Sequence, residues 1–149
     1  MQYSEGRIGR VFMIRIDDGE DLLEELRRFA ERMGVKTGVI QFLGALRQGR
    51  MVTGPEEPVI PPVPHWEEYS DGWEIIGFAT LYPGDNGPAI HVHASLGKGR
   101  DTKTGCLRER AETYLVVEAV LTEYVGIAAQ RVHDEKTGLH LPALDSQFT

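Results

Sequence analysis

The clearest periodic feature of this chain is one amphipathic helix, which stands among segments of a different pattern. Between residues 22 and 33, apolar side chains recur every three or four positions and so share one helical face; they are Leu22, Leu23, Leu26, Phe29, Ala30 and Met33. Asp18 is expected to cap the start of the helix and Gly34 to end it. A chain with so little helix must build most of its core from strands.

The other apolar segments have the composition and alternation of β-strands. The turn sequence Pro-Gly-Asp-Asn-Gly-Pro at 83–88 would join its flanking strands into a hairpin. Residues 113–125 are ambiguous, although β-branched residues and tyrosine favour a strand there. Strands outnumber helices and do not alternate with them, so the predicted class is α+β: a mostly antiparallel sheet packed with one or two helices. The other expected strands are 10–16, 35–46, 73–82, 89–96 and 127–133, with 47–53 as a further candidate.

The length of 149 residues fits one domain. We expect a single domain over residues 1–149, with its core at about 8–133 and an irregular tail at 134–149. Five prolines between residues 54 and 72 predict a long loop, which carries His65 and Trp66 and could cover a nearby site. A second, glycine-rich loop is expected at 97–105.

Composition excludes several classes of protein. The chain has 16 basic and 23 acidic residues, and its formal net charge of −7 is unfavourable for coating nucleic acid by bulk charge. No apolar run approaches the roughly 20 residues of a membrane helix, and residues 1–10 lack the apolar segment of a secretory signal. One cysteine cannot form an internal disulfide, which fits a reducing compartment. We therefore expect a cytoplasmic protein without membrane partners.

Two histidines separated by one residue carry the most informative chemistry. In a strand, His91 and His93 point to the same side while Val92 points to the other. Neutral imidazole is the commonest metal ligand in proteins, so this pair is suited to hold one ion. The alternative is that both histidines are ordinary polar side chains on the wet face of a strand.

A third ligand decides between these interpretations, because zinc normally takes three or four protein ligands. Cys106, the single cysteine, is the candidate, although a lone cysteine also fits a small buried apolar role. A set of two histidines and one cysteine leaves one tetrahedral position open for water or a substrate atom. A closed structural site would need a fourth side chain, for which the spare candidates are His65, His133, His140 and Glu118.

With these residues identified, the chain resembles the PPC (plants and prokaryotes conserved) domain family, in its stand-alone prokaryotic form. The resemblance covers about Arg10 to Tyr124. It is carried by the early strand and helix and by the segments 38–46, 72–78 and 91–97. Many prokaryotic members have Gly-Gly-His-Leu after the His-x-His strand. This chain has Thr-Gly-Cys-Leu at 104–107, so Cys106 takes the place of a third histidine and Thr104 that of a glycine.

The resemblance implies a compact domain that assembles as a homotrimer. In such a trimer, one face of residues 113–125 would meet the core and the other a neighbouring subunit; burial of both faces within one chain is the alternative. The exchange of one zinc ligand type for another at Cys106 favours zinc as the bound metal. Family members are often labelled predicted DNA-binding proteins because plant members carry AT-hooks, but Gly6–Arg10 lacks the Arg-Gly-Arg-Pro core of a hook.

Three functions follow as hypotheses. The first is a trimeric zinc-binding domain of unassigned biochemical role, with regulation as one option. The second is a metal-dependent hydrolase or lyase in which zinc activates water and Glu74 or Glu118 is the general base, although both carboxylates also fit ordinary surface positions. The third is a DNA-associated protein without an AT-hook. Its basic patch would comprise Arg7, Arg10, Arg47, Arg50, Lys98, Arg100 and Lys103, with scattered solubilising charges as the alternative.

Overall fold

The computed structural model describes residues 1–144 and shows one helix and eight strands in that range. The strands form a six-stranded antiparallel sheet and a separate two-stranded hairpin. In chain order the elements are β1 (Arg7–Asp17), α1 (Leu22–Met33), β2 (Gly38–Pro55), β3 (Pro64–Tyr69), β4 (Trp73–Gly84), β5 (Gly87–Lys98), β6 (Asp101–Val125), β7 (Ala129–Asp134) and β8 (Leu139–Leu144).

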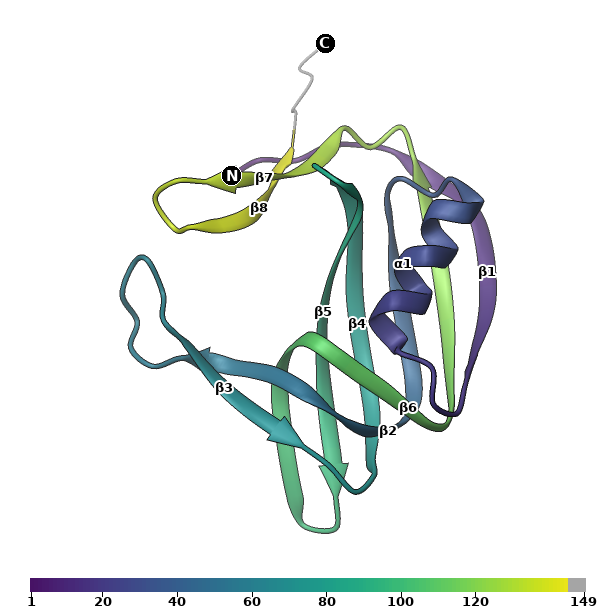
Figure 1. Cartoon of the computed structure of the whole chain (residues 1–149). Coiled ribbons are helices and arrows are strands. Elements are labelled where there is room, and N and C mark those ends of the chain that lie inside the picture. The colour runs from purple at the N-terminus through teal and green to yellow at the C-terminus, as the bar shows by residue number, and fades with distance from the viewer. Residues whose placement is uncertain (145–149) are drawn as a thin grey trace.

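The long strand β6 organises the sheet. The strand order is β1-β6-β5-β4-β2-β3, and β6 also pairs with β2. The first residues of β6 pair with β5, and its later residues pair with β1 and with β2. These pairings close β2, β4, β5 and β6 into a ring, and the curvature of the sheet is visible in Figure 1.

The core lies between α1 and one face of the sheet. Leu22, Leu26 and Ala30 of the helix are fully buried, and α1 lies against the sheet in Figure 1. The strands alternate so that every second side chain enters this core. Sheet residues in the core include Ile16, Ile40, Phe42, Ile75, Ala79, Leu81, Val92, Ala94, Leu96, Val117, Ala119 and Leu121. The prediction of a mostly antiparallel sheet is thus confirmed. With one short helix among residues 1–144, the α+β class fits loosely.

The opposite face of the sheet, which we call the outer face, keeps several large apolar side chains exposed. Met13, Leu43, Ile76 and Phe78 have exposed fractions of 75%, 55%, 66% and 46%. The strand register places them in adjacent cross-strand rows: Phe78 lies opposite both Gln41 and His93, and Leu43 lies opposite Ile76. We call these four residues the apolar outer patch.

Several expected boundaries differ from the structure. The 54–72 segment contains strand β3, because the backbone from Pro64 onward pairs with β2. The expected 97–105 loop is only a tight turn at 99–100, and β6 begins at Asp101. The irregular tail is wrong for residues 139–144, which form β8 and pair with β7; the rest of that tail, 145–149, lies outside the described residues.

The helix ends are set by side-chain caps. Asp21, rather than Asp18, is the N-cap, and its carboxylate accepts hydrogen bonds from the backbone N–H groups of Leu23 and Glu24. Asp18 instead accepts from the N–H of Leu115 on β6 and from Arg47. Gly34 ends the helix as expected, in a left-handed conformation with φ of 65°. No helix of residues 1–144 has the length and apolarity needed to cross a bilayer.

The ion pair between Arg10 and Glu123 is expected to make the stability of this fold depend on pH. Glu123 accepts hydrogen bonds from the backbone N–H, Nε and Nη2 of Arg10. These bonds lower the pKa of the Glu123 carboxyl to about 2. A carboxyl whose pKa is lowered by folding stabilises the folded state above its ordinary pKa of 4.5, and that stabilisation is lost as the pH falls toward 2.

Glu123→Gln is therefore expected to lower the midpoint of urea unfolding at pH 7, and the difference from wild type should narrow between about pH 5 and about pH 3. Glu31→Gln is the control, because Glu31 forms only an exposed helical pair with Arg27 and should change the midpoint little. Equal midpoints of wild type and Glu123→Gln at pH 7 would contradict this role of Glu123.

Candidate metal centre

The two histidines of the His-x-His pair lie side by side on the outer face of β5. Val92 between them is 1% exposed and belongs to the core, as the strand alternation predicts. The rings of His91 and His93 meet edge to face, with centroids 4.9 Å apart and an interplanar angle of 83°. His91 is half-buried and His93 is exposed, so the pair spans the boundary between the protein and solvent.

Cys106 is brought to the same place by the turn between β5 and β6. In the register of these strands, Cys106 lies directly opposite His93, and directly opposed residues share a face of the sheet. The ligand atoms of His91, His93 and Cys106 all lie within 4.8 Å of one another. The residues predicted from the sequence are therefore together in the structure.

The surroundings favour the neutral form of His91. Burial lowers the pKa of His91 to about 4, and the charge of Arg131 acts in the same direction. A neutral imidazole has a lone pair free for a metal at neutral pH. Burial raises the pKa of the Cys106 thiol, whereas the nearby charges of Arg108 and Arg131 act in the opposite direction. These cations would compensate part of the negative charge of a thiolate ligand.

The spare ligand candidates lie outside this cluster. His65 Nδ1 is 2.9 Å from Glu56 Oε1, and His133 and His140 pack against each other on the β7–β8 hairpin with ring centroids 5.3 Å apart. Glu118 is exposed on the outer face of β6. Within residues 1–144, His91, His93 and Cys106 are the one group of three or more such side chains close enough to share an ion. The cluster thus supplies three ligands and leaves a fourth position open.

A cavity of about 550 Å³ opens beside the three residues. Its walls come from β2, β3, β5 and β6, from the proline-rich segment between β2 and β3, and from the hairpin. The 54–72 segment lines this cavity through Trp66, three prolines and Gly54, whereas His65 does not line it. The lining residues are Val52, Thr53, Gly54, Pro55, Pro62, Pro64, Trp66, His91, His93, Thr104, Gly105, Cys106, Arg108 and Leu139.

The chain matches a known protein family. The model of the Plants and Prokaryotes Conserved (PCC) domain, the PPC domain named above, matches residues 3–125. The chain belongs to the PPC domain family. The match ends before β7, so the β7–β8 hairpin lies beyond the stretch that the family model covers. No functionally curated protein matches the chain.

Solved PPC-like structures share the whole fold. A metal-containing protein from Archaeoglobus fulgidus is 29% identical, with a TM-score of 0.84 over 95% of this chain and 98% of its own. A PPC protein from Pyrococcus horikoshii is 24% identical, with a TM-score of 0.84 over the full length of both chains. A candidate DNA-binding protein from Bacteroides thetaiotaomicron is 19% identical, with a TM-score of 0.76 over 97% of this chain and 99% of its own.

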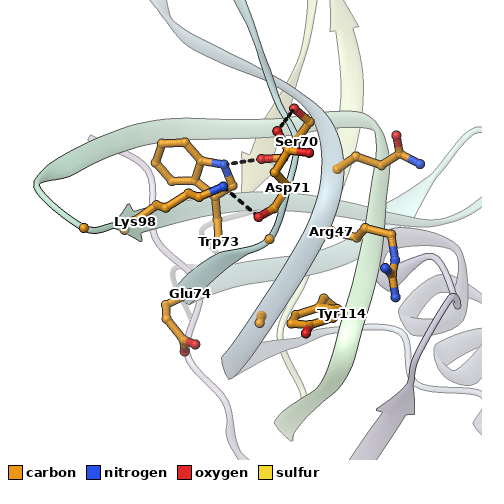
Figure 2. Close-up of a pocket in the computed structure, with 12 residues that line it drawn as sticks. Arg47, Ser70, Asp71, Trp73, Glu74, Lys98 and Tyr114 are labelled. Atoms are coloured by element: carbon orange, nitrogen blue, oxygen red, sulfur yellow. Dashed lines mark hydrogen bonds between the residues drawn. The ribbon is translucent and has the colours of Figure 1, made fainter.

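This PPC domain has a second, more polar hollow of about 710 Å³ at the other end of β4 and β5, shown in Figure 2. Its polar groups are largely partnered within the chain. Lys98 Nζ donates to the carbonyl of Asp71, and Trp73 Nε1 donates to that of Ser70. Glu74 lines this hollow and not the cavity at Cys106, so the structure does not bring this proposed general base to the histidine pair.

The basic residues of the PPC domain do not form one free patch. Four of the seven candidates are paired with carboxylates, which reduces the charge they offer to a phosphate backbone. The pairs are Arg10 with Glu123, Arg47 with Asp18 and Glu112, Arg50 with Glu109, and Lys103 with Glu67. The structure therefore lends no support to a phosphate-binding surface built from these residues.

Three neighbours of the histidine pair were not predicted from the sequence. Arg108 and Arg131 lie close enough for their charges to act on both His91 and Cys106, and Leu139 forms part of the cavity wall. Arg108 could have been suspected, because a residue two positions after Cys106 in a strand shares its face. Arg131 and Leu139 carry no such signal, since their position depends on how the hairpin folds back.

Proposed function

We propose that this PPC domain binds one zinc ion per chain through His91, His93 and Cys106. The single observation that carries the proposal is the convergence of their ligand atoms within 4.8 Å. Imidazole nitrogen and thiolate sulfur are the ligands that zinc prefers, and the neutral state of His91 suits it for that role. The Archaeoglobus fulgidus structure of the same fold is of a metal-containing protein, which supports metal binding by this fold.

The chemistry at the open position favours binding over catalysis. A bound zinc ion supplies a Lewis acid that attracts an electron-pair donor. The chain's own residues would hold that donor, and the lining of the cavity includes neither aspartate nor glutamate. A hydrolase or lyase would need a general base there. Of the two carboxylates considered, Glu74 lines the other hollow, and Glu118 shares with His93 the hollow over the apolar outer patch but does not line the cavity at Cys106. A binding, and hence regulatory, role fits this set of residues better.

The apolar outer patch supports the second part of the proposal, assembly as a homotrimer. Met13, Leu43, Ile76 and Phe78 expose apolar side chains around one hollow on the outer face, which Gln41 and Glu118 also line. Exposed apolar surface of this kind is typical of interaction sites. His93 borders this patch, since it lies opposite Phe78. The zinc centre would then lie at the edge of the subunit interface. With a thiolate ligand needed in reduced form, we place the protein in the cytoplasm.

The test of the zinc centre is the metal content of the purified chain. Loading with zinc followed by dialysis should leave about one zinc per chain, measured by elemental analysis. Cobalt(II) in place of zinc should give a sulfur-to-cobalt charge-transfer band in the near ultraviolet, and Cys106→Ser should lose that band. A loaded wild-type chain without bound metal, or a band that survives Cys106→Ser, would contradict the proposed ligands.

A further inference from the structure

The cavity beside the zinc ligands has one apolar side. Apolar side chains supply much of its lining: Trp66, three prolines (Pro55, Pro62 and Pro64), Val52 and Leu139. Proline rings are rigid, so this wall needs little ordering when a ligand arrives. A volume of about 550 Å³ lies within the range of roughly 300–1,000 Å³ seen for small-molecule sites. The cavity is thus suited to a flat or cyclic apolar body of modest size.

The other side of the cavity is cationic. Arg108 lines it, and none of the ion pairs within residues 1–144 involves Arg108. Its neighbours along β6 are different: Arg110 pairs with Glu112, and Glu109 pairs with Arg50. A guanidinium without a carboxylate of its own, in a cavity whose lining contains no acidic residue, attracts an anion.

Arg131 adds to this positive charge from the β7–β8 hairpin. Its Nη1 donates to the carbonyl of His140 and its Nη2 to Thr80 Oγ1, which fixes the side chain between the hairpin and β4. Its Nε is buried without a hydrogen-bond partner among the described residues. The charge of Arg131 reaches both His91 and Cys106. The hairpin therefore extends the positive field of the zinc site.

We propose that this cavity binds a small organic carboxylate with an aromatic or cyclic apolar body. The carboxylate would lie between Arg108 and the open position of the zinc centre, and the body would lie against Trp66 and the prolines. The zinc contact rests on the proposed function; the contacts to Arg108 and Trp66 rest on the cavity alone. A neutral or cationic molecule of the same shape would lose the charge-assisted contact and bind more weakly.

Benzoate is the probe that tests this proposal. Benzoate, benzyl alcohol and benzylamine are titrated into the zinc-loaded wild-type chain by calorimetry at pH 7. Benzoate is expected to bind at least about 10-fold more tightly than either analogue, the difference expected for a charge-assisted hydrogen bond. Arg108→Gln should weaken benzoate binding about 10- to 100-fold. Trp66→Leu should weaken it about 10-fold, because an aromatic contact is lost.

Arg100→Gln is the matched control, because Arg100 is exposed in the turn between β5 and β6 and does not line the cavity. It should bind benzoate as wild type does. Circular dichroism confirms that each variant is folded, and the zinc content of each sample is measured alongside. A wild-type chain with bound zinc that prefers benzoate no more than benzyl alcohol, or an Arg108→Gln chain with unweakened binding, overturns the proposal and leaves the zinc centre standing. A chain that binds no zinc contradicts only the proposed zinc centre. The same benzoate titration of the metal-free chain then tests the proposed binding by the cavity.

Discussion

Replacing His91 by alanine is expected to abolish binding of the proposed zinc ion. His91 is the more buried of the two histidines, and burial keeps its imidazole neutral by lowering its pKa to about 4. Loss of the partners that merely orient zinc ligands already costs about 10–100-fold in affinity, so loss of a ligand itself should cost about 100-fold or more. A competition titration with a zinc-binding dye measures this change directly.

The matched control for His91→Ala is His133→Ala. His133 lies on the β7–β8 hairpin against His140, outside the group that could share an ion, and its replacement should leave zinc affinity unchanged. His93→Ala and Cys106→Ala are expected to behave like His91→Ala, because three ligands act on one ion. Wild-type zinc content in both His91→Ala and Cys106→Ala would contradict the proposed zinc site.

A single charge on the apolar outer patch is expected to separate the subunits of the proposed trimer. Ile76 is 66% exposed and lies opposite Leu43 in the middle of the patch. In a trimer built on this face, Ile76→Glu would bury an unpaired carboxylate in each subunit, at a cost of several kcal/mol per ion. In the isolated chain the same carboxylate stays in water, so the fold should be kept. Sedimentation equilibrium should show the mass falling from that of a trimer to that of one chain, 16.6 kDa.

Val59→Glu serves as the comparison for Ile76→Glu. Val59 is 50% exposed in the segment between β2 and β3 and does not line the hollow over the outer patch. Its replacement changes the net charge by the same amount and hydropathy by nearly the same amount, and it should leave the mass unchanged. A wild-type chain that sediments as a monomer, or a trimer that persists in Ile76→Glu, would show that the patch is not the subunit interface.

Local sequence patterns were sufficient to predict those elements whose structure depends on neighbours along the chain. The helix at 22–33 follows from its apolar period, and the hairpin of β4 and β5 follows from its turn sequence. The shared face of His91 and His93 follows from strand alternation alone. The place of Cys106 needed the turn at 99–100, which sets the register that puts it opposite His93.

Features that depend on distant pairing could not be predicted from the same patterns. The proline content of 54–72 led to the prediction of a loop. The segment nevertheless contains β3, whose hydrogen bonds are to β2 rather than within the segment. The tail beyond residue 134 gave no sign that Leu139 would reach the cavity at Cys106. The helix cap also depends on a contact distant in sequence: Asp18 accepts a hydrogen bond from the N–H of Leu115 on β6, and Asp21 caps the helix.

The place of β6 in the sheet has a consequence for synthesis of the protein. Arg7 at the start of β1 pairs with Val125 at the end of β6, and β2 also pairs with β6 over much of its length. During translation, β1 and β2 therefore leave the ribosome well before the strand that covers their edges. Unpaired edges are templates for association with other chains, so the interval before residue 125 emerges is when a nascent copy is most exposed to aggregation and to capture by chaperones.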